Sequence, residues 1–152
     1  MKYLIIIHSP LQVINAYEFI KINNVSNDNY EILFLSTNDT HNDNTISSLI
    51  KDMLKPNYIF KQIYLKHIQS IKKLNKFILL IKSQNKHCEN VVFGNINSLT
   101  IRYIVNGLGK KNILIDDGTS TFNFDYFRKN KYLIDEKILF FLKIKYVIIK
   151  KI

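Results

Sequence analysis

The sequence predicts an α/β fold, an open Rossmann-like parallel sheet with helices on both of its faces. Short apolar runs alternate along the chain with segments of helical periodicity, the order typical of parallel strands joined by crossover helices. The first run, YLIII at residues 3–7, is apolar throughout, as expected of a strand buried on both faces. The chain has 152 residues, 47% of them hydrophobic, which is enough for one core.

Five strands are expected where apolar runs are bounded by polar residues. After the first run, the stretches YEILFLS, YIFKQIYL, NVVFGN and NILID carry this pattern. The predicted strands are therefore residues 3–7, 30–36, 58–65, 90–95 and 112–116.

Four helices are expected between these strands, at residues 11–22, 45–54, 68–82 and 98–108. In the first, Val13, Ala16 and Ile20 share one apolar stripe, the spacing of an amphipathic helix. The polar run TNDTHNDN before the second helix is interpreted as a loop. The pattern blurs beyond Gly118, and residues 134–152 are compatible with either a helix or a strand.

The chain is basic, with a formal net charge of +10. Residues 51–86 hold nine lysines and one acid, and residues 128–151 hold eight basic residues and two acids. Such charge favours an anionic partner, such as a nucleotide, an anionic glycan, an acidic lipid or a nucleic acid. A lysine-rich solvated surface explains it equally well.

The single cysteine, Cys88, excludes an intrachain disulfide and makes a cysteine-based metal cluster improbable. No signal peptide and no apolar run long enough to span a bilayer is evident, so we expect a cytoplasmic protein. No metal site is expected.

The stretch HSPLQ, residues 8–12, joins the first strand to the first helix. Ser9 is expected to cap the helix, with Pro10 at its first position and Gln12 completing a capping box. A helix N-terminus at the carboxyl end of a strand also attracts anions, so Ser9, Pro10 and Gln12 are candidate substrate-binding residues. His8 fits a packed or solvent-facing histidine better than a ligand contact.

The stretch FGNINS, residues 93–98, follows the fourth strand. Gly94 would let the backbone approach a ligand, and Asn95, Asn97 and Ser98 offer neutral donors and acceptors suited to sugar hydroxyls or a nucleobase. An ordinary helix cap explains the Asn and Ser residues equally well.

The stretch LIDDGTS, residues 114–120, follows the fifth strand. Adjacent strand residues point to opposite faces, so only one of Asp116 and Asp117 is expected to face the cleft. A carboxylate there can accept a proton from an attacking sugar hydroxyl. Asp-Gly is also an ordinary turn signal.

The stretches SPLQVINAYEF (residues 9–19), FGNINS (93–98) and IDDGTS (115–120) together resemble the N-terminal lobe of bacterial sialyltransferases of the polysialyltransferase-like and lipooligosaccharide families. The most specific part is Pro10–Gln12 followed by Asn15–Glu18. The resemblance implies one lobe of a two-lobed GT-B glycosyltransferase and inverting transfer from CMP-sialic acid. It implies that Asp116 is the general base, with Asp117 as second choice, and that Gly118 and Thr119 lie at the acceptor. It also implies no metal and no other cofactor, because CMP is a monophosphate leaving group.

The resemblance covers residues 1–127 and leaves 128–152 as a basic, apolar C-terminal segment. The His-Pro motif, which lies in the donor-binding lobe of these enzymes, is absent. We therefore expect an acceptor-side lobe that is inactive alone and that serves capsular polysaccharide or lipooligosaccharide synthesis. Its expected partners are a CMP-sugar donor and a glycan acceptor, and the lysines would suit peripheral attachment to the anionic inner membrane.

Two other interpretations stay open. A non-catalytic Rossmann-like module that binds a nucleotide or a partner chain would also explain the missing donor motif. Formation of a homodimer also stays open. Nucleic-acid binding is suggested by charge alone and is not expected, because no recognised nucleic-acid motif is present.

Overall fold

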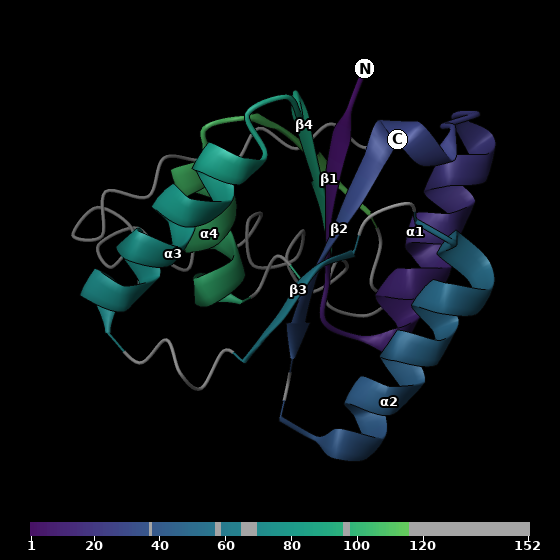
Figure 1. Cartoon of the computed structure of the whole chain (residues 1–152), viewed down its shortest axis with the longest axis horizontal. Coiled ribbons are helices and arrows are strands. Elements are labelled where there is room, and N and C mark those ends of the chain that lie inside the picture. Colours follow the sequence, from purple (N-terminus) through teal and green to yellow (C-terminus); the bar gives the residue numbers. More distant parts are fainter. Residues whose placement is uncertain (37, 57–58, 65–69, 96–97, 116–152) are drawn as a thin grey trace, which may run out of the picture.

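The protein is described by a computed structural model, which places residues 1–36, 38–56, 59–64, 70–95 and 98–115. Its centre is a five-stranded sheet with the spatial order β3-β2-β1-β4-β5, and every neighbouring pair is parallel (Figure 1). The strands are β1 (Tyr3–Ile7), β2 (Tyr30–Ser36), β3 (Ile59–Tyr64), β4 (Asn90–Phe93) and β5 (Lys111–Leu114).

Helices cover both faces of this sheet. They are α1 (Pro10–Ile22), α2 (Thr40–Leu49), α3 (Ile71–Gln84) and α4 (Leu99–Leu108), with a short 3-10 turn η1 (Asn27–Asn29) and a π-helical turn η2 (Ile50–Leu54). The helices α1 and α2 lie on one face, and α3 and α4 lie on the other (Figure 1). The predicted fold class, a Rossmann-like parallel sheet with helices on both faces, is confirmed.

The central strand β1 shows why its sequence is apolar throughout. Leu4 and Ile6 belong to the core beneath α3 and α4, whereas Ile5 and Ile7 belong to the core beneath α1 and α2. All four are at most 1% exposed. Burying each such side chain stabilises the fold by about 1.5–3 kcal/mol, so β1 anchors both layers.

The prediction that the polar run TNDTHNDN forms a loop before the second helix is wrong, because α2 begins within this run, at Thr40. Asp39 caps it, and its Oδ1 accepts bonds from the backbone N–H groups of His41 (3.0 Å) and Asn42 (3.2 Å). These bonds satisfy two of the N–H groups that a helix start leaves without an intrahelical partner. The polar residues thus form the first turns of α2, which continues into η2.

The fourth strand is shorter than predicted. It ends at Phe93, because Asn95 takes the left-handed conformation (φ 53°) and turns the chain toward α4. Asparagine is the non-glycine residue that tolerates this conformation best.

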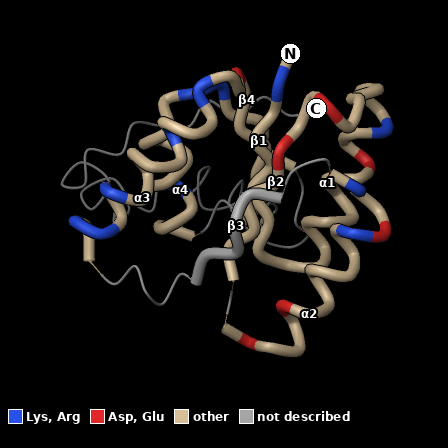
Figure 2. Tube along the Cα trace, viewed as in Figure 1, with Lys and Arg blue, Asp and Glu red and all other residues tan. Residues whose placement is uncertain are grey.

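Charge is uneven over the described surface. Helix α3 carries four lysines and no acid, and lysines mark both of its ends, whereas α2 carries one acid and no lysine or arginine (Figure 2). Among the described helices, none combines the length and apolar character that a bilayer crossing requires.

Candidate functional site

The strand order makes the carboxyl ends of β1 and β4 a topological switch point, the place where an open parallel sheet is expected to hold a ligand crevice, and this region is called the crevice below. These neighbouring strands pair in parallel, but the chain leaves β1 for α1 on one face and leaves β4 for α4 on the opposite face. The two connecting loops therefore diverge. In open parallel sheets this point of divergence is where ligands bind.

The start of α1 forms one wall of the crevice. Ser9 caps the helix and Pro10 is its first residue, as the sequence predicts, and the Ser9 Oγ accepts from the Gln12 N–H at 3.4 Å. The reciprocal bond differs from a standard capping box. The Gln12 Oε1 accepts from the backbone N–H of His8 (2.9 Å), one residue before the cap.

Gln12 is buried, with no exposed surface, and it fixes the neighbouring histidine. Its Nε2 lies 3.1 Å from the Nε2 of His8. Because the Oε1 of Gln12 accepts from His8 N–H, the Nε2 atom is the amide nitrogen and can only donate. The ring Nε2 of His8 therefore accepts, and in this arrangement the imidazole is neutral with its proton on Nδ1.

The same glutamine explains Gly94 in the loop after β4. A Cβ added to Gly94 would lie 2.8 Å from the Nε2 of Gln12, 3.0 Å from its Cγ and 3.1 Å from its Cδ. The sequence suggested that the glycine admits a ligand, whereas here it admits a side chain from the opposite loop. Gln12 thus ties the two loops together from beneath, and direct contact of Gln12 or Gly94 with a ligand stays a prediction.

The start of α4 forms the other wall. Ser98 caps this helix, with its Oγ accepting from the Ile101 N–H at 3.4 Å, and the Ser98 N–H donates to the carbonyl of Asn95 at 3.1 Å. Both Asn95 and Ser98 are partly exposed. The structure therefore brings Ser9, Asn95 and Ser98 to the same sheet edge, next to two capped helix N-termini.

The remaining predicted site residues, Asn97, Asp116, Asp117, Gly118 and Thr119, lie outside the described residues, as does the predicted segment 128–152. The described chain ends at Ile115, whose N–H donates to the carbonyl of Phe93 at 2.9 Å. The fifth strand thus ends beside the strand that leads into Gly94.

Among the residues that the structure describes, the crevice has no lysine, arginine or carboxylate side chain. Its described polar side chains are His8, Ser9, Asn95 and Ser98, which are neutral donors and acceptors when the imidazole is neutral. The two helix N-termini add partial positive charge. This combination suits hydroxyl groups or a single anionic group, and it offers no ligand set typical of a metal.

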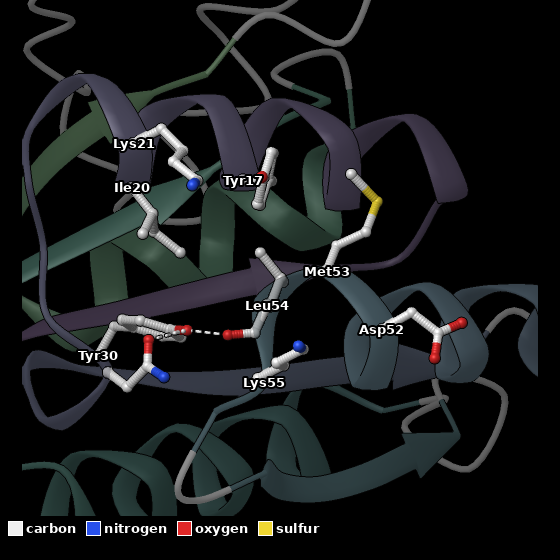
Figure 3. Close-up of a pocket in the computed structure, with 9 residues that line it drawn as sticks. Tyr17, Ile20, Lys21, Tyr30, Asp52, Met53, Leu54 and Lys55 are labelled. Atoms are coloured by element: carbon white, nitrogen blue, oxygen red, sulfur yellow. Dashed lines mark hydrogen bonds between the residues drawn. The ribbon is translucent and has the colours of Figure 1, made fainter.

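A second hollow, of about 410 Å³, lies between the end of α1 and η2 (Figure 3). Tyr30 lies at its floor, donating to the carbonyl of Leu54 and to the Asn27 Oδ1 at 3.2 Å. Burial raises the pKa of its phenol. Lys21 and Lys55 also line this hollow, but the carboxylate there, Asp52, points away from Tyr30 in Figure 3, so the described residues assemble no acid–base pair in it.

Sequence reasoning missed one cluster of chemically active side chains, Glu31, His87 and Cys88, at the opposite, amino edge of the sheet. Glu31 and His87 are 56 residues apart, so no local sequence pattern predicts their contact. The only signal in the sequence was the adjacent pair His87 and Cys88.

Compared with models of protein families, with curated proteins and with solved structures, the chain has no significant match in any of the three.

Proposed function

We propose that this chain is the acceptor-side lobe of a sialyltransferase-like glycosyltransferase of the GT-B type. In this proposal the lobe binds a glycan whose hydroxyl attacks CMP-sialic acid, in capsular polysaccharide or lipooligosaccharide synthesis. The observation that carries the proposal is the β1–β4 crevice, where two capped helix N-termini meet neutral polar side chains. Such a surface can bind sugar hydroxyls and one carboxylate together.

The first turn argues against a dinucleotide as the ligand. Dinucleotide-binding folds use a glycine-rich turn after the first strand, so that backbone N–H groups approach a pyrophosphate. Here the turn is His8, Ser9, Pro10, with no glycine and one N–H group fewer. Gln12 fills the space between this turn and Gly94. The crevice therefore favours a ligand that is smaller and less charged at this point.

In the proposed reaction, Asp116 accepts the proton of the attacking hydroxyl, and Asp117 is the second choice for this role. Gly118 and Thr119 would border the acceptor, and Asn97 would join Asn95 and Ser98 in binding it. The reaction as proposed needs no metal, because a monophosphate leaving group can be neutralised by hydrogen-bond donors. The lysines of α3 would hold the lobe near the anionic inner membrane surface or near a polyanionic glycan.

The test is a titration of the ¹⁵N-labelled chain, followed by amide chemical shifts. A sialylated oligosaccharide should shift the amides of His8, Ser9, Gly94 and Ser98. The matched neutral oligosaccharide without sialic acid should shift them less. Shifts centred on another part of the sheet, or no shifts at millimolar ligand, would contradict the proposed site.

A pair of asparagine variants makes this test specific. Asn95 and Asn24 both have left-handed backbones (φ 53° and 50°), so glycine fits either position without strain. Asn95→Gly removes one amide side chain from the crevice and should weaken binding several-fold. Asn24→Gly makes the same change at the far end of α1 and should leave binding unaltered.

Catalysis is tested separately. We expect the chain alone to release negligible CMP from CMP-sialic acid with an acceptor present, because the His-Pro motif is absent from it. Measurable acceptor-dependent CMP release would overturn this part of the proposal.

The second candidate is a non-catalytic module that binds a nucleotide or another chain at the same crevice. It is favoured by the helix N-terminus at Ser9, which could bind a phosphate. If CMP or another nucleotide alone shifts the crevice amides while the sialylated glycan does not, this alternative replaces the glycosyltransferase proposal.

A further inference from the structure

A cluster of three metal-binding side chains lies at the amino edge of the sheet, away from the proposed glycan site. Glu31 is the second residue of β2, and His87 and Cys88 lie three and two residues before Asn90, the first residue of β4. The strand β1 runs between β2 and β4 and pairs with both. The cluster therefore joins two segments that flank the first strand of the fold.

The backbone holds these segments in place. The N–H of Glu89 donates to the carbonyl of Lys2 at 3.0 Å, and the N–H of Cys88 donates to the carbonyl of Asn85 at 3.1 Å. Glu31 is paired in register with Leu4 of β1. Because the backbone at Glu31 and Cys88 is held by hydrogen bonds, bringing a cation to these two side chains costs little further ordering.

The donor atoms are close enough to share one ion. The Nε2 of His87 lies 2.6 Å from the Oε1 of Glu31, and one donor atom from each of the three residues lies within 4.8 Å of the other two. Tetrahedral zinc, with bonds of about 2.3 Å to sulfur and about 2.0 Å to nitrogen or oxygen, needs donor separations of roughly 3.3–3.5 Å. Side-chain rotations that move each donor by about 1 Å would reach that geometry.

The donor types select the metal. A thiolate, an imidazole and a carboxylate together suit Zn²⁺ and other borderline transition metals, whereas Mg²⁺ and Ca²⁺ require oxygen ligands. The His87 side chain is 42% exposed and that of Glu31 is 20% exposed, while Cys88 is 1% exposed. An ion can therefore enter from solvent past His87, with the thiol at the base of the site and a water completing the coordination.

We propose that Glu31, His87 and Cys88 form a zinc site that clamps β2 and β4 across β1. Nearby positive charge limits its affinity. Lys110 donates through its Nζ to the carbonyl of Cys88. The positive charges of Lys110 and Lys2 both lower the pKa of the Cys88 thiol. In the metal-free protein, burial first and Glu31 second raise the pKa of that thiol to about 11, so a bound ion must displace its proton.

The chain's single cysteine makes a spectroscopic test decisive. Cobalt(II), added to the reduced full chain as a probe for zinc, should produce a thiolate-to-cobalt charge-transfer band in the near ultraviolet. Any such band must come from Cys88, and zinc added afterwards should abolish it. Zinc should also raise the thermal unfolding midpoint in proportion to the logarithm of its concentration, and EDTA should reverse the shift.

Three variants distinguish cobalt binding at Glu31, His87 and Cys88 from weaker binding at other sites. Glu31→Gln and His87→Ala, both at partly exposed positions, should each weaken cobalt affinity by at least about 10–100-fold with unchanged circular dichroism. His41→Ala, which removes an exposed histidine at the start of α2, should change nothing. Absence of the charge-transfer band at millimolar cobalt, or a band unaffected by both ligand variants, overturns the proposal. Because these readouts ignore glycans, they are independent of the proposed function.

Discussion

The close contact between Gly94 and Gln12 gives a quantitative prediction for the stability of the variant Gly94→Ala. Gly94→Ala places a Cβ 2.8 Å from the Nε2, 3.0 Å from the Cγ and 3.1 Å from the Cδ of Gln12. Separations of about 3 Å between such atoms are well inside their optimal contact of about 3.5–4.0 Å. Gln12 has no exposed surface into which it could retreat, so something must shift.

The expected cost follows from overpacking. Inserting one methyl group into a closely packed site typically costs about 1–3 kcal/mol. Displacing Gln12 would also weaken its 2.9 Å bond with His8, which adds about 1 kcal/mol. We therefore expect Gly94→Ala to lower the free energy of unfolding by about 2–4 kcal/mol, a large share of the 5–15 kcal/mol typical of a domain.

A double-mutant cycle assigns this cost to the named contact. Gln12→Ala removes the three atoms that would lie nearest to the new Cβ, although it also loses the bonds to His8. In the Gln12→Ala background, Gly94→Ala should therefore cost less than about 0.5 kcal/mol, a coupling of at least about 1.5 kcal/mol. Urea unfolding, followed by the helical circular dichroism signal at about 222 nm, measures the free energy of unfolding of the wild type, both single variants and the double variant.

Gly109→Ala is the matched control. Gly109 has a left-handed backbone (φ 65°), and among the described residues its Cβ would meet only the Nζ of Lys82, at 3.6 Å. Its substitution should cost about 1 kcal/mol through backbone strain alone and should add independently to Gln12→Ala. A cost below about 0.5 kcal/mol for Gly94→Ala, or simple additivity with Gln12→Ala, would refute the reasoning.

Three further predictions concern the fold outside the crevice. Tyr30→Phe should cost about 1–3 kcal/mol at neutral pH, because it leaves the Leu54 carbonyl without this donor. Burial raises the pKa of Tyr30, so the phenol ionises first in the unfolded chain, at a pH of about 10. The wild type should therefore lose stability as pH rises above that value. Urea titrations should show that the difference in free energy of unfolding between the wild type and Tyr30→Phe becomes smaller there. Gly107→Ala should lower the thermal unfolding midpoint, because its Cβ would lie 2.8 Å from the Cδ1 of Ile78. Adding Ile78→Val removes Cδ1 but should not restore the midpoint fully, because the Cγ2 of Ile78 would lie 2.9 Å from the same Cβ. Full restoration would mean that the clash is with Cδ1 alone. Asp39→Ala should cost about 1 kcal/mol in urea unfolding by removing the cap of α2, whereas Asp39→Asn should cost only a few tenths.

Elements governed by local periodicity could be predicted well from the sequence. The strands β1 and β2 coincide with their predicted ranges, and α1 and α4 begin within one residue of theirs. The cap at Ser9 and the proline after it were also predictable, because a helix start is decided by residues within one turn of each other. The start of α2 was missed because its first turns are polar, and apolar periodicity cannot detect a helix turn stabilised by a cap such as Asp39.

Contacts between distant segments could not be predicted in this way. The sequence correctly placed Ser9, Asn95 and Ser98 at helix starts, but it did not indicate that Gln12 would reach Gly94, 82 positions away in the numbering of the chain. Nor did it indicate that Glu31 would meet His87. Each of these pairs depends on the strand order, which the hydrophobic pattern of a single strand does not encode.

By itself, then, the sequence determined the α/β class, most element ranges and the polar character of the strand ends, since these depend on the period of burial and on short-range hydrogen bonds. Only the tertiary structure decided which strand ends become neighbours, which face each helix covers, and that Gln12 rather than a ligand occupies the space beside Gly94. The physical reason is that side chains far apart in the chain meet only after the sheet has formed, and close packing then leaves each of them few positions.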